Sequence, residues 1–386
     1  MKLKKIIENV LLTLFFIVVI AFPWIAKFTG VENNLFGAEE KVEFSFENID
    51  DYIIQNFPGR SLLVRTKNQL LYSLFDISPN KSIVKVGDTL FSTETLNYYF
   101  HKLHDVTDAH VEELVTKIKK FDEICKSKDK KLLVILTPTK PRYYSGSLPF
   151  ADDVIMLHES KSEYADNYSI DNLRPYDRLL RALKKTDLNF FDSINYINSH
   201  KTEVIGGKVP LFYNSSHHWS VYKANLIGLA LHEHMRQTLN IKLPRILITA
   251  SPSEVPTYPD ADLFNTLNIY DKPNEQFYES VLDYKDFEND NLNFTIQGGS
   301  FLGGLLFPQI TLSVFGDVYH IENKVLLYDK YQNHDSFESY DELNEKFNLI
   351  DHLKKTDVFV LEINELNVYN ATFGFIDYLL EHEEEI

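Results

Sequence analysis

The feature that most constrains the fold is a continuous apolar run, Leu132–Leu136, which ends at Thr137-Pro138. A strand without polar alternation is typical of a parallel sheet that is covered on both faces. Apolar residues at helical spacing over 109–126 and 173–185 predict helices on either side of this strand. Strands separated by helices predict a right-handed, mostly parallel α/β sheet.

The same alternation continues along the chain. The other predicted strands are 83–86, 89–91, 188–191, 293–296, 311–321 and 357–361, and the other predicted helices are 61–76 and 220–238. In an open α/β sheet, ligands bind beyond the C-terminal ends of the strands. We therefore expect functional residues in 137–140, at Asp192, in 298–300 and in 362–365.

Composition limits the class of protein. The chain has 386 residues, of which 44% are hydrophobic and 25% charged, and this indicates one large globular domain or two ordinary ones. Its formal net charge of −17 argues against general nucleic-acid binding, which needs clustered Lys and Arg. Cys125 is the single cysteine, so an intrachain disulfide and a Cys-based zinc or iron–sulfur site are excluded.

The N-terminal residues predict a membrane anchor. Lys2, Lys4 and Lys5 precede an uncharged and largely apolar stretch, Asn9–Ala26. Such a stretch is at the short end of what crosses a bilayer, and the preceding lysines place the N-terminus inside. A cleaved signal peptide and a buried core helix are alternatives, although no clear small-x-small cleavage site follows.

The predicted domain organisation follows from this anchor. Residues 1–28 form cytoplasmic lysines and a transmembrane helix, residues 29–95 lead into the domain, and residues 96–386 form the catalytic domain. Everything after the anchor is expected outside the cytoplasm, as a single-pass protein of the cell membrane.

A first chemical motif is Gln297-Gly298-Gly299-Ser300, directly after a predicted strand. Glycine permits a tight strand-to-helix turn and leaves backbone N–H groups open. Ser300 would present its hydroxyl at the edge of the sheet, beside a backbone that can stabilise an oxyanion. A Gly-Gly-Ser segment on its own is more often only a turn.

A second motif precedes the predicted helix 220–238 and contains Ser216, His217, His218, Trp219 and Ser220. Imidazole is the usual proton acceptor for a serine hydroxyl at neutral pH. Packed or surface histidines are the alternative, and Ser216 or Ser220 is also a candidate for the helix cap.

A metal site is the third possibility, because His232-Glu233-His234 lies downstream. Positions i and i+2 point to different faces of a helix, which argues against it.

Taken in order, the motifs resemble the SGNH-hydrolase-like proteins of polysaccharide acetylation, namely the alginate O-acetyltransferase group and the proteins named for an Asp-His-His-Trp motif. The matching segments are the N-terminal anchor, Phe57-Pro58-Gly59-Arg60, Val86–Phe91, Pro138-Thr139-Lys140 with Tyr143 and Leu148-Pro149, His217-His218-Trp219, Gly299-Ser300-Phe301 and Leu361–Glu365. The resemblance implies a three-layer SGNH-like sandwich with a mostly parallel central sheet.

The resemblance also implies roles for residues. Ser300 would be the nucleophile and His218 its general base. The family's acid lies two residues before this histidine, where the present chain has Ser216. Another carboxylate then serves from elsewhere, or Ser300 and His218 work as a dyad, or the chain is a non-catalytic member. Supporting positions would be His217, Trp219, Lys140, Gly298 and Gly299, the last standing where many relatives have Asp.

The resemblance implies an extracytoplasmic O-acyltransferase, with acetyl as the expected acyl group, or an esterase, acting on a cell-surface or exopolysaccharide through an ester on the serine. This function requires no cofactor and no metal. The family also implies a multipass membrane acyltransferase as the acyl-donor partner. The alternative is a non-catalytic glycan-binding or assembly component of a polysaccharide export or modification complex.

Overall fold

The computed structural model describes residue 21 and residues 60–99, 106–144, 174–284, 288–328 and 333–386. The predicted anchor therefore lies outside the described residues, apart from Ala21. Within those ranges, no helix is both long enough and apolar enough to span a bilayer.

The chain divides into two compact units. One comprises residues 1–80 and 264–273, and the other comprises residues 81–263 and 274–386. In the first unit, Arg65 of helix α3 (Arg60–Leu74) donates Nε and Nη2 to the carbonyl oxygen of Ile269, at 2.9 and 2.8 Å. The second unit contains the central sheet and the candidate site. The predicted domain boundary at residue 95 stays a prediction.

The central sheet has seven strands in the order β10-β9-β8-β7-β11-β3-β4. Their bounds are β3 Lys131–Thr137, β4 Phe190–Asp192, β7 Phe294–Gly298, β8 Val318–Glu322, β9 Val325–Tyr328, β10 Asn333–Ser336 and β11 Val358–Asn364. The five strands from β8 to β4 are parallel, and β9 and β10 add an antiparallel edge. The predicted α/β class with a mostly parallel sheet is therefore confirmed.

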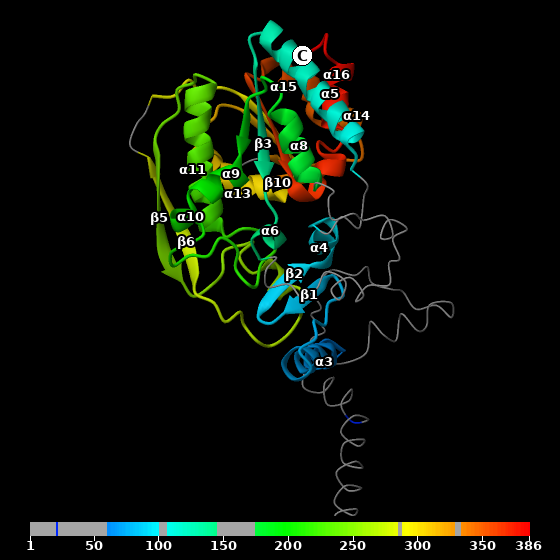
Figure 1. Ribbon diagram of the computed structural model, residues 1–386, viewed down its shortest axis with the longest axis vertical. Helices are drawn as coiled ribbons and strands as arrows, with labels where there is room; N and C mark the ends of the chain where they lie inside the picture. Colours follow the sequence, from blue (N-terminus) through cyan, green and yellow to red (C-terminus); the bar gives the residue numbers. More distant parts are fainter. Residues whose placement is uncertain (1–20, 22–59, 100–105, 145–173, 285–287, 329–332) are drawn as a thin grey trace, which may run out of the picture. The chain divides into compact units, whose positions relative to one another are not determined.

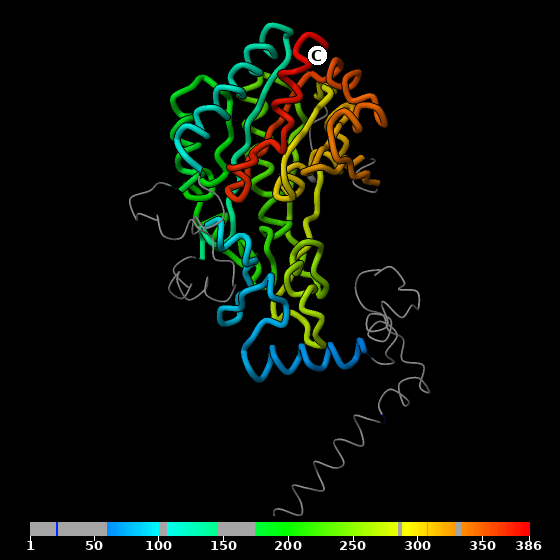
Figure 2. The backbone as a smooth tube through the Cα atoms, turned by 90° about the vertical axis from the view of Figure 1, so that its right-hand side faces the viewer, coloured from blue at the N-terminus to red at the C-terminus, as the bar shows by residue number. Residues whose placement is uncertain are grey.

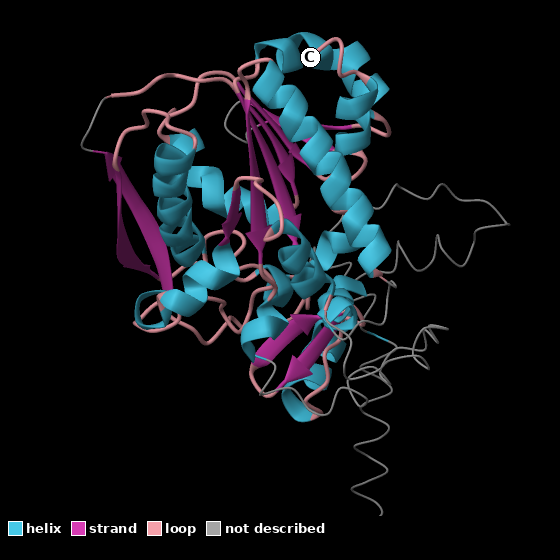
Figure 3. Cartoon of the chain, turned by 45° about the horizontal axis from the view of Figure 1, so that its top comes forward, coloured by secondary structure: helices cyan, strands magenta, loops and turns pink. Residues whose placement is uncertain are grey.

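Helices cover both faces of this sheet, which gives three layers (Figures 1 and 3). Alternation along β3 shows the reason, since successive side chains of a strand point to opposite faces. Leu133 and Ile135 pack in one core with α11 (Val221–Thr238) and α13 (Ser300–Thr311). Leu132, Val134 and Leu136 pack in the other core, with the remaining large helices. Those helices are α5 Asp108–Ser127, α8 Pro175–Leu183, α14 Tyr340–Phe347, α15 Leu349–Lys355 and α16 Phe375–Glu381.

Segments far apart in the sequence lie side by side in the sheet. The tube in Figure 2 shows the C-terminal part of the chain running beside the segment of α5 and β3. The register of β11 on β3 pairs Val358 with Lys131 and Asn364 with Thr137. Because these strands are parallel, the segments that follow β3, β7 and β11 meet at one edge of the sheet.

Smaller elements surround the sheet. Two antiparallel pairs are separate from it, namely β1 (Ile83–Val86) with β2 (Thr89–Ser92) and β5 (Ile246–Ser253) with β6 (Phe277–Tyr284). The shorter helices are α4 Thr93–Tyr99, α6 Lys140–Tyr144, α9 Ser193–Ser199, α10 Lys201–Val204, α12 Asp262–Asn265 and the 3-10 helix η3 Glu365–Asn370.

One predicted strand, 311–321, is wrong over its first half. Helix α13 continues to Thr311, the chain turns at Ser313 with φ of 53°, and β8 begins only at Val318. The intervening Val314 and Phe315 are buried in the core that α13 shares with the sheet. Their apolar character therefore reflects burial of a turn and not pairing in a strand.

Candidate active site

The turn after β7 places Ser300 at the first position of helix α13, with Gly299 at the N-cap. A side chain at Gly298 has no room, because an ideal Cβ there would lie 2.6 Å from Glu362 Cβ and 2.9 Å from Leu302 Cδ2. The N–H of Gly299 donates to Glu362 Oε2 at 2.7 Å. The double glycine thus allows the strand end to approach β11 closely.

The loop that carries the adjacent histidines is held by a buried lysine. Lys140 Nζ donates to the carbonyl oxygens of Leu90, Tyr213, Asn214 and Ser216, at 2.8, 2.8, 3.0 and 2.7 Å. Burial lowers the pKa of Lys140 to about 7, against the negative charges of Glu275 and Asp262, which favour the charged ammonium. Lys140 therefore supports the loop, and none of these four hydrogen bonds involves Ser300.

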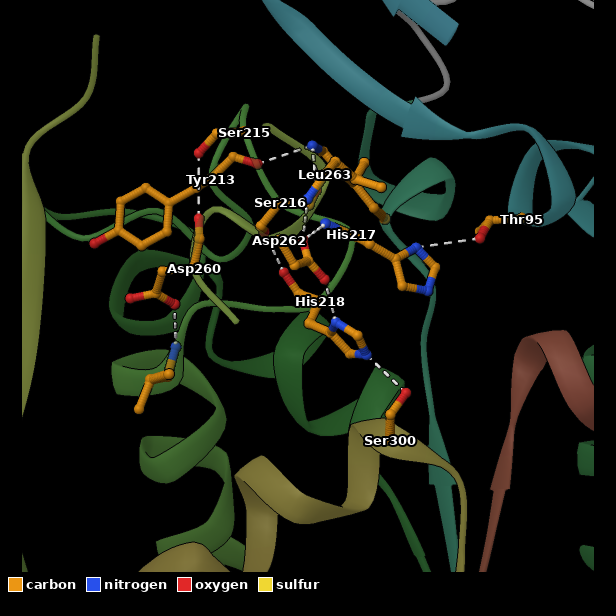
Figure 4. A network of polar contacts seen from close by, with 12 residues as sticks. Thr95, Tyr213, Ser215, Ser216, His217, His218, Asp260, Asp262, Leu263 and Ser300 are labelled. Atoms are coloured by element: carbon orange, nitrogen blue, oxygen red, sulfur yellow. Dashed lines mark hydrogen bonds and ion pairs between the residues drawn. The ribbon is translucent and has the colours of Figure 1, made fainter. Parts of the chain in front are cut away.

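The two predicted motifs meet. His218 Nε2 lies 2.7 Å from Ser300 Oγ across 82 positions of sequence (Figure 4). On its other side, His218 Nδ1 lies 2.6 Å from Asp262 Oδ2. A carboxylate can only accept, so Nδ1 carries the ring proton, and Nε2 of the neutral ring accepts from the serine hydroxyl. Serine, histidine and aspartate form one continuous hydrogen-bonded chain.

Asp262 is fixed by the same loop that it orients. Its Oδ1 accepts from the backbone N–H of His217 at 2.7 Å and of Leu263 at 2.8 Å. Burial raises the pKa of Asp262, but the hydrogen bond and charge of His218 and the His217 N–H outweigh burial, and the net pKa is lowered. The carboxylate is thus held ionised beside the imidazole.

The other residues that the sequence predicts as supports pack around the Ser300–His218–Asp262 hydrogen-bond chain. Ser216 is fully buried, and its Oγ donates to the carbonyl oxygen of His218 at 2.5 Å and not to the imidazole. His217 Nδ1 lies 3.2 Å from Thr95 Oγ1, and burial lowers the His217 pKa to about 3, which keeps this ring neutral. Trp219 is buried, with its ring centroid 5.7 Å from that of Phe301. Ser220, and not Ser216, caps α11.

Sequence reasoning did not single out Asp262. The residue lies 44 positions beyond His218, in the segment Tyr258-Pro259-Asp260-Ala261-Asp262. Two aspartates spaced by one residue after a proline are a weak signal at best. Asp260 has a different role, since its Oδ1 accepts from the Val221 N–H at 2.8 Å at the start of α11.

Two further carboxyl groups lie at the C-terminal edge of the sheet. Glu362 accepts from Thr137 Oγ1 as well as from Gly299, and burial raises its pKa to about 7. Glu322 ends β8 directly beside Gly298, and burial raises its pKa also, against the influence of His218. In the described structure, the ring nitrogens of His218 are hydrogen-bonded to Asp262 and Ser300 and not to either of these glutamates.

The downstream histidines are engaged elsewhere. His232 Nε2 lies 2.6 Å from Pro244 O, and His234 Nε2 lies 3.0 Å from Asn189 Oδ1. Across the described ranges, no group of three or more His, Cys, Asp or Glu side chains is arranged to hold a metal ion.

Three solved structures are similar to this chain. The O-acetyltransferase domain of Pseudomonas putida AlgJ has 16% identity and a TM-score of 0.45, over 78% of this chain and 99% of that one. Bacillus cereus PatB1 has 11% identity and a TM-score of 0.43, over 74% and 96%. Pseudomonas aeruginosa AlgX has 13% identity and a TM-score of 0.44, over 76% and 66%.

No family model matches the sequence. No curated protein matches it either. At these identities and TM-scores, the likeness by itself carries no argument about function.

Proposed function

We propose that this chain is a serine-dependent O-acyltransferase or esterase that handles acetyl groups and acts on a cell-surface or exopolysaccharide. The observation that carries the proposal is the chain of hydrogen bonds from Asp262 through His218 to Ser300, at 2.6 and 2.7 Å. A nucleophile, a base within reach and a third group that orients the base together define nucleophilic catalysis.

In the first half-reaction, Ser300 Oγ attacks the carbonyl carbon of the acyl donor. His218 Nε2 takes the hydroxyl proton, and Asp262 stabilises the imidazolium that results. The tetrahedral intermediate collapses as the C–O bond to the leaving alcohol breaks, and His218 returns the proton to that alcohol. The acyl group is then an ester on Ser300.

The negatively charged oxygen of the tetrahedral intermediate needs hydrogen-bond donors that stabilise it. The Ser300 N–H belongs to the first turn of α13, where no intrahelical acceptor exists and the helix dipole favours an anion. The Gly299 N–H is already engaged by Glu362. An ideal Cβ on Gly299 would lie 3.2 Å from Asn367 Nδ2, so the Asn367 amide is a second donor candidate beside the turn.

In the second half-reaction, His218 takes the proton of an acceptor hydroxyl, whose oxygen attacks the acyl carbon and releases Ser300 Oγ with its proton restored. A sugar hydroxyl as acceptor gives transfer, and water as acceptor gives hydrolysis. The same residues serve both outcomes, which differ only in which hydroxyl reaches the ester.

The non-catalytic alternative drew its support from serine at position 216, because the family's acid is missing there. Asp262 supplies a carboxylate to His218 from a different segment of the chain. The departure at Ser216 therefore no longer favours a binding or assembly component over an enzyme.

The proposal includes a location and a partner. The lysines and the stretch Asn9–Ala26 support a single-pass anchor with the catalytic unit outside the cytoplasm, and a multipass membrane acyltransferase would supply acyl groups. Protease added to the outer face of the cytoplasmic membrane should degrade residues 29–386. Full protection of this region would overturn the extracytoplasmic location.

The test of the enzymatic proposal is turnover of a chromogenic acetyl ester by the full-length chain. Ser300→Ala should abolish turnover, and the intact mass of the wild type should show an acetyl ester that is absent from the variant. Ser199→Ala, at an exposed serine of α9, is the matched control. Equal rates in the wild type and Ser300→Ala would rule out the serine mechanism.

A further inference from the structure

A carboxyl group that has no hydrogen-bond or ion-pair partner among the described residues lies over the helix that begins with Ser300. Glu322 is the last residue of β8, and its backbone pairs with Gly298, two positions before Ser300. An ideal Cβ on Gly303 would lie 3.9 Å from Glu322 Oε2. Positions three apart share a helix face, so this carboxyl lies over the face of α13 that carries Ser300.

The surroundings of Glu322 leave its oxygens for a ligand. Among the residues that the structure describes, no hydrogen bond or ion pair to its side chain is present, although it is only partly exposed. The adjacent Asn323 fixes the strand end through its N–H, which donates to Gly298 O at 2.8 Å. A partly buried carboxyl that the protein leaves unsatisfied is suited to accept hydrogen bonds from hydroxyl groups.

An exposed aromatic ring belongs to the same neighbourhood. Tyr258 is 82% exposed, four positions before Asp262. The N–H groups of Asp260 and Asp262 donate to the carbonyl oxygens of Thr257 and Pro259, at 2.7 and 3.0 Å, so a tight turn holds Tyr258 close to Asp262. The exposed ring therefore lies near the aspartate of the triad and presents an apolar face to solvent.

The charges around this neighbourhood are acidic. Glu322 lies within the electrostatic influence of His218, and Glu322 in turn raises the pKa of Glu362. Lys140, whose charge acts on His217, has its ammonium enclosed by four carbonyl oxygens. An anionic sugar would therefore bring a like charge next to Glu322.

We propose that Glu322 selects the acceptor by accepting hydrogen bonds from the hydroxyls of an uncharged sugar and repelling uronates, while Tyr258 stacks on the sugar ring. The assignment rests on the proposed function, because it describes the acceptor side of that site. The acceptor is therefore a neutral glycan and not a polyuronate.

Binding separates this inference from catalysis. The full-length Ser300→Ala chain, which cannot turn over, is titrated with a neutral cello-oligosaccharide and with an oligogalacturonate of equal length. We expect the neutral ligand to bind at least about tenfold more tightly, a ratio that like-charge repulsion readily supplies. Adding Glu322→Gln should bring the ratio close to one. Adding Tyr258→Ala should weaken both ligands about tenfold and leave their ratio unchanged.

The controls are Glu279→Gln and Tyr284→Ala, at exposed positions of β6, which should change neither affinity nor ratio. Equal or tighter binding of the uronate, binding of neither ligand, or an unchanged ratio in Glu322→Gln with intact thermal unfolding would each overturn the inference. Loss of acetyl-ester turnover in the wild type with the binding preference intact would instead overturn the enzymatic proposal alone.

Discussion

His218 Nδ1 and Asp262 Oδ2 lie 2.6 Å apart although the two residues are 44 positions apart in the chain. The other oxygen of this carboxylate accepts a hydrogen bond from the backbone N–H of the preceding residue, His217, at 2.7 Å. The carboxylate therefore orients both the imidazole and the loop that carries it. The acid therefore comes from a different segment of the chain than the histidine, and the position two residues before His218 holds Ser216.

The first prediction concerns this carboxylate. Asp262→Asn should lower kcat for acetyl-ester turnover by roughly 10³–10⁴, because an amide can stabilise the wrong tautomer of His218 and brings no charge. Asp260→Asn, two positions away, is the matched control. Asp260 contacts the Val221 N–H and not the imidazole, so its substitution should change kcat by less than about tenfold. Equal losses in the two variants would mean that Asp262 has no special role.

The second prediction concerns Ser216. Ser216→Asp should lower both activity and stability, because the buried hydroxyl donates to His218 O and a carboxylate cannot donate there. Ser216→Ala should be milder, at about 1 kcal/mol for one lost hydrogen bond. Ester turnover and thermal unfolding measure the two effects. Higher turnover in Ser216→Asp would show that Asp262 is not the working acid.

The sequence identifies the nucleophile and the base more readily than the acid, for a physical reason. Ser300 and His218 each stand next to a secondary-structure boundary, a glycine turn after a strand and a capped helix start, and both leave local patterns. Asp262 lies in a loop that reaches His218 only through the tertiary fold. Nothing within a few residues of it signals that contact.

The same distinction applies to the fold. Parallel strands such as β3 and β11 are buried on both faces and read as apolar runs, so the sheet class follows from the sequence. The strands of the β5–β6 pair are mostly exposed and contain no such apolar run, so the sequence analysis did not predict them. The turn at Val314 causes the opposite error, because it is buried and apolar and is therefore predicted as a strand that it does not form.

The third prediction concerns Lys140 as a positioning residue. Lys140→Met leaves four loop carbonyls without their shared donor, so the loop of His218 should loosen and kcat should fall more than about tenfold. Lys223→Met is the control, because Lys223 Nζ likewise donates to two carbonyl oxygens, of Glu203 and Gly206. Both variants should unfold at lower temperature, but only Lys140→Met should lose kcat when assayed well below both unfolding temperatures. Equal kcat values in the two variants would contradict the positioning role.

The fourth prediction concerns the pH dependence of stability through Glu362. Burial raises the pKa of this carboxyl to about 7 from an ordinary value of 4.5. Between these two values the native state holds a proton that the unfolded chain releases, so this group's contribution to the free energy of unfolding falls as pH rises through the window. The loss is at most about 3 kcal/mol, and it is complete above the folded pKa.

Glu362→Gln should remove this dependence while preserving the local contacts. The amide oxygen can accept from the Gly299 N–H, and the amide nitrogen can donate to Thr137 Oγ1. Urea unfolding of the wild type, of Glu362→Gln and of the exposed control Glu279→Gln is measured from pH 4.5 to pH 8. We expect the wild type and Glu279→Gln to lose stability in parallel as pH rises, and Glu362→Gln to lose less. Asp260, whose pKa burial also raises to about 7, is present in all three chains, so the difference between the curves belongs to Glu362. Three parallel curves would show that the Glu362 carboxyl is ionised in the native state across this range.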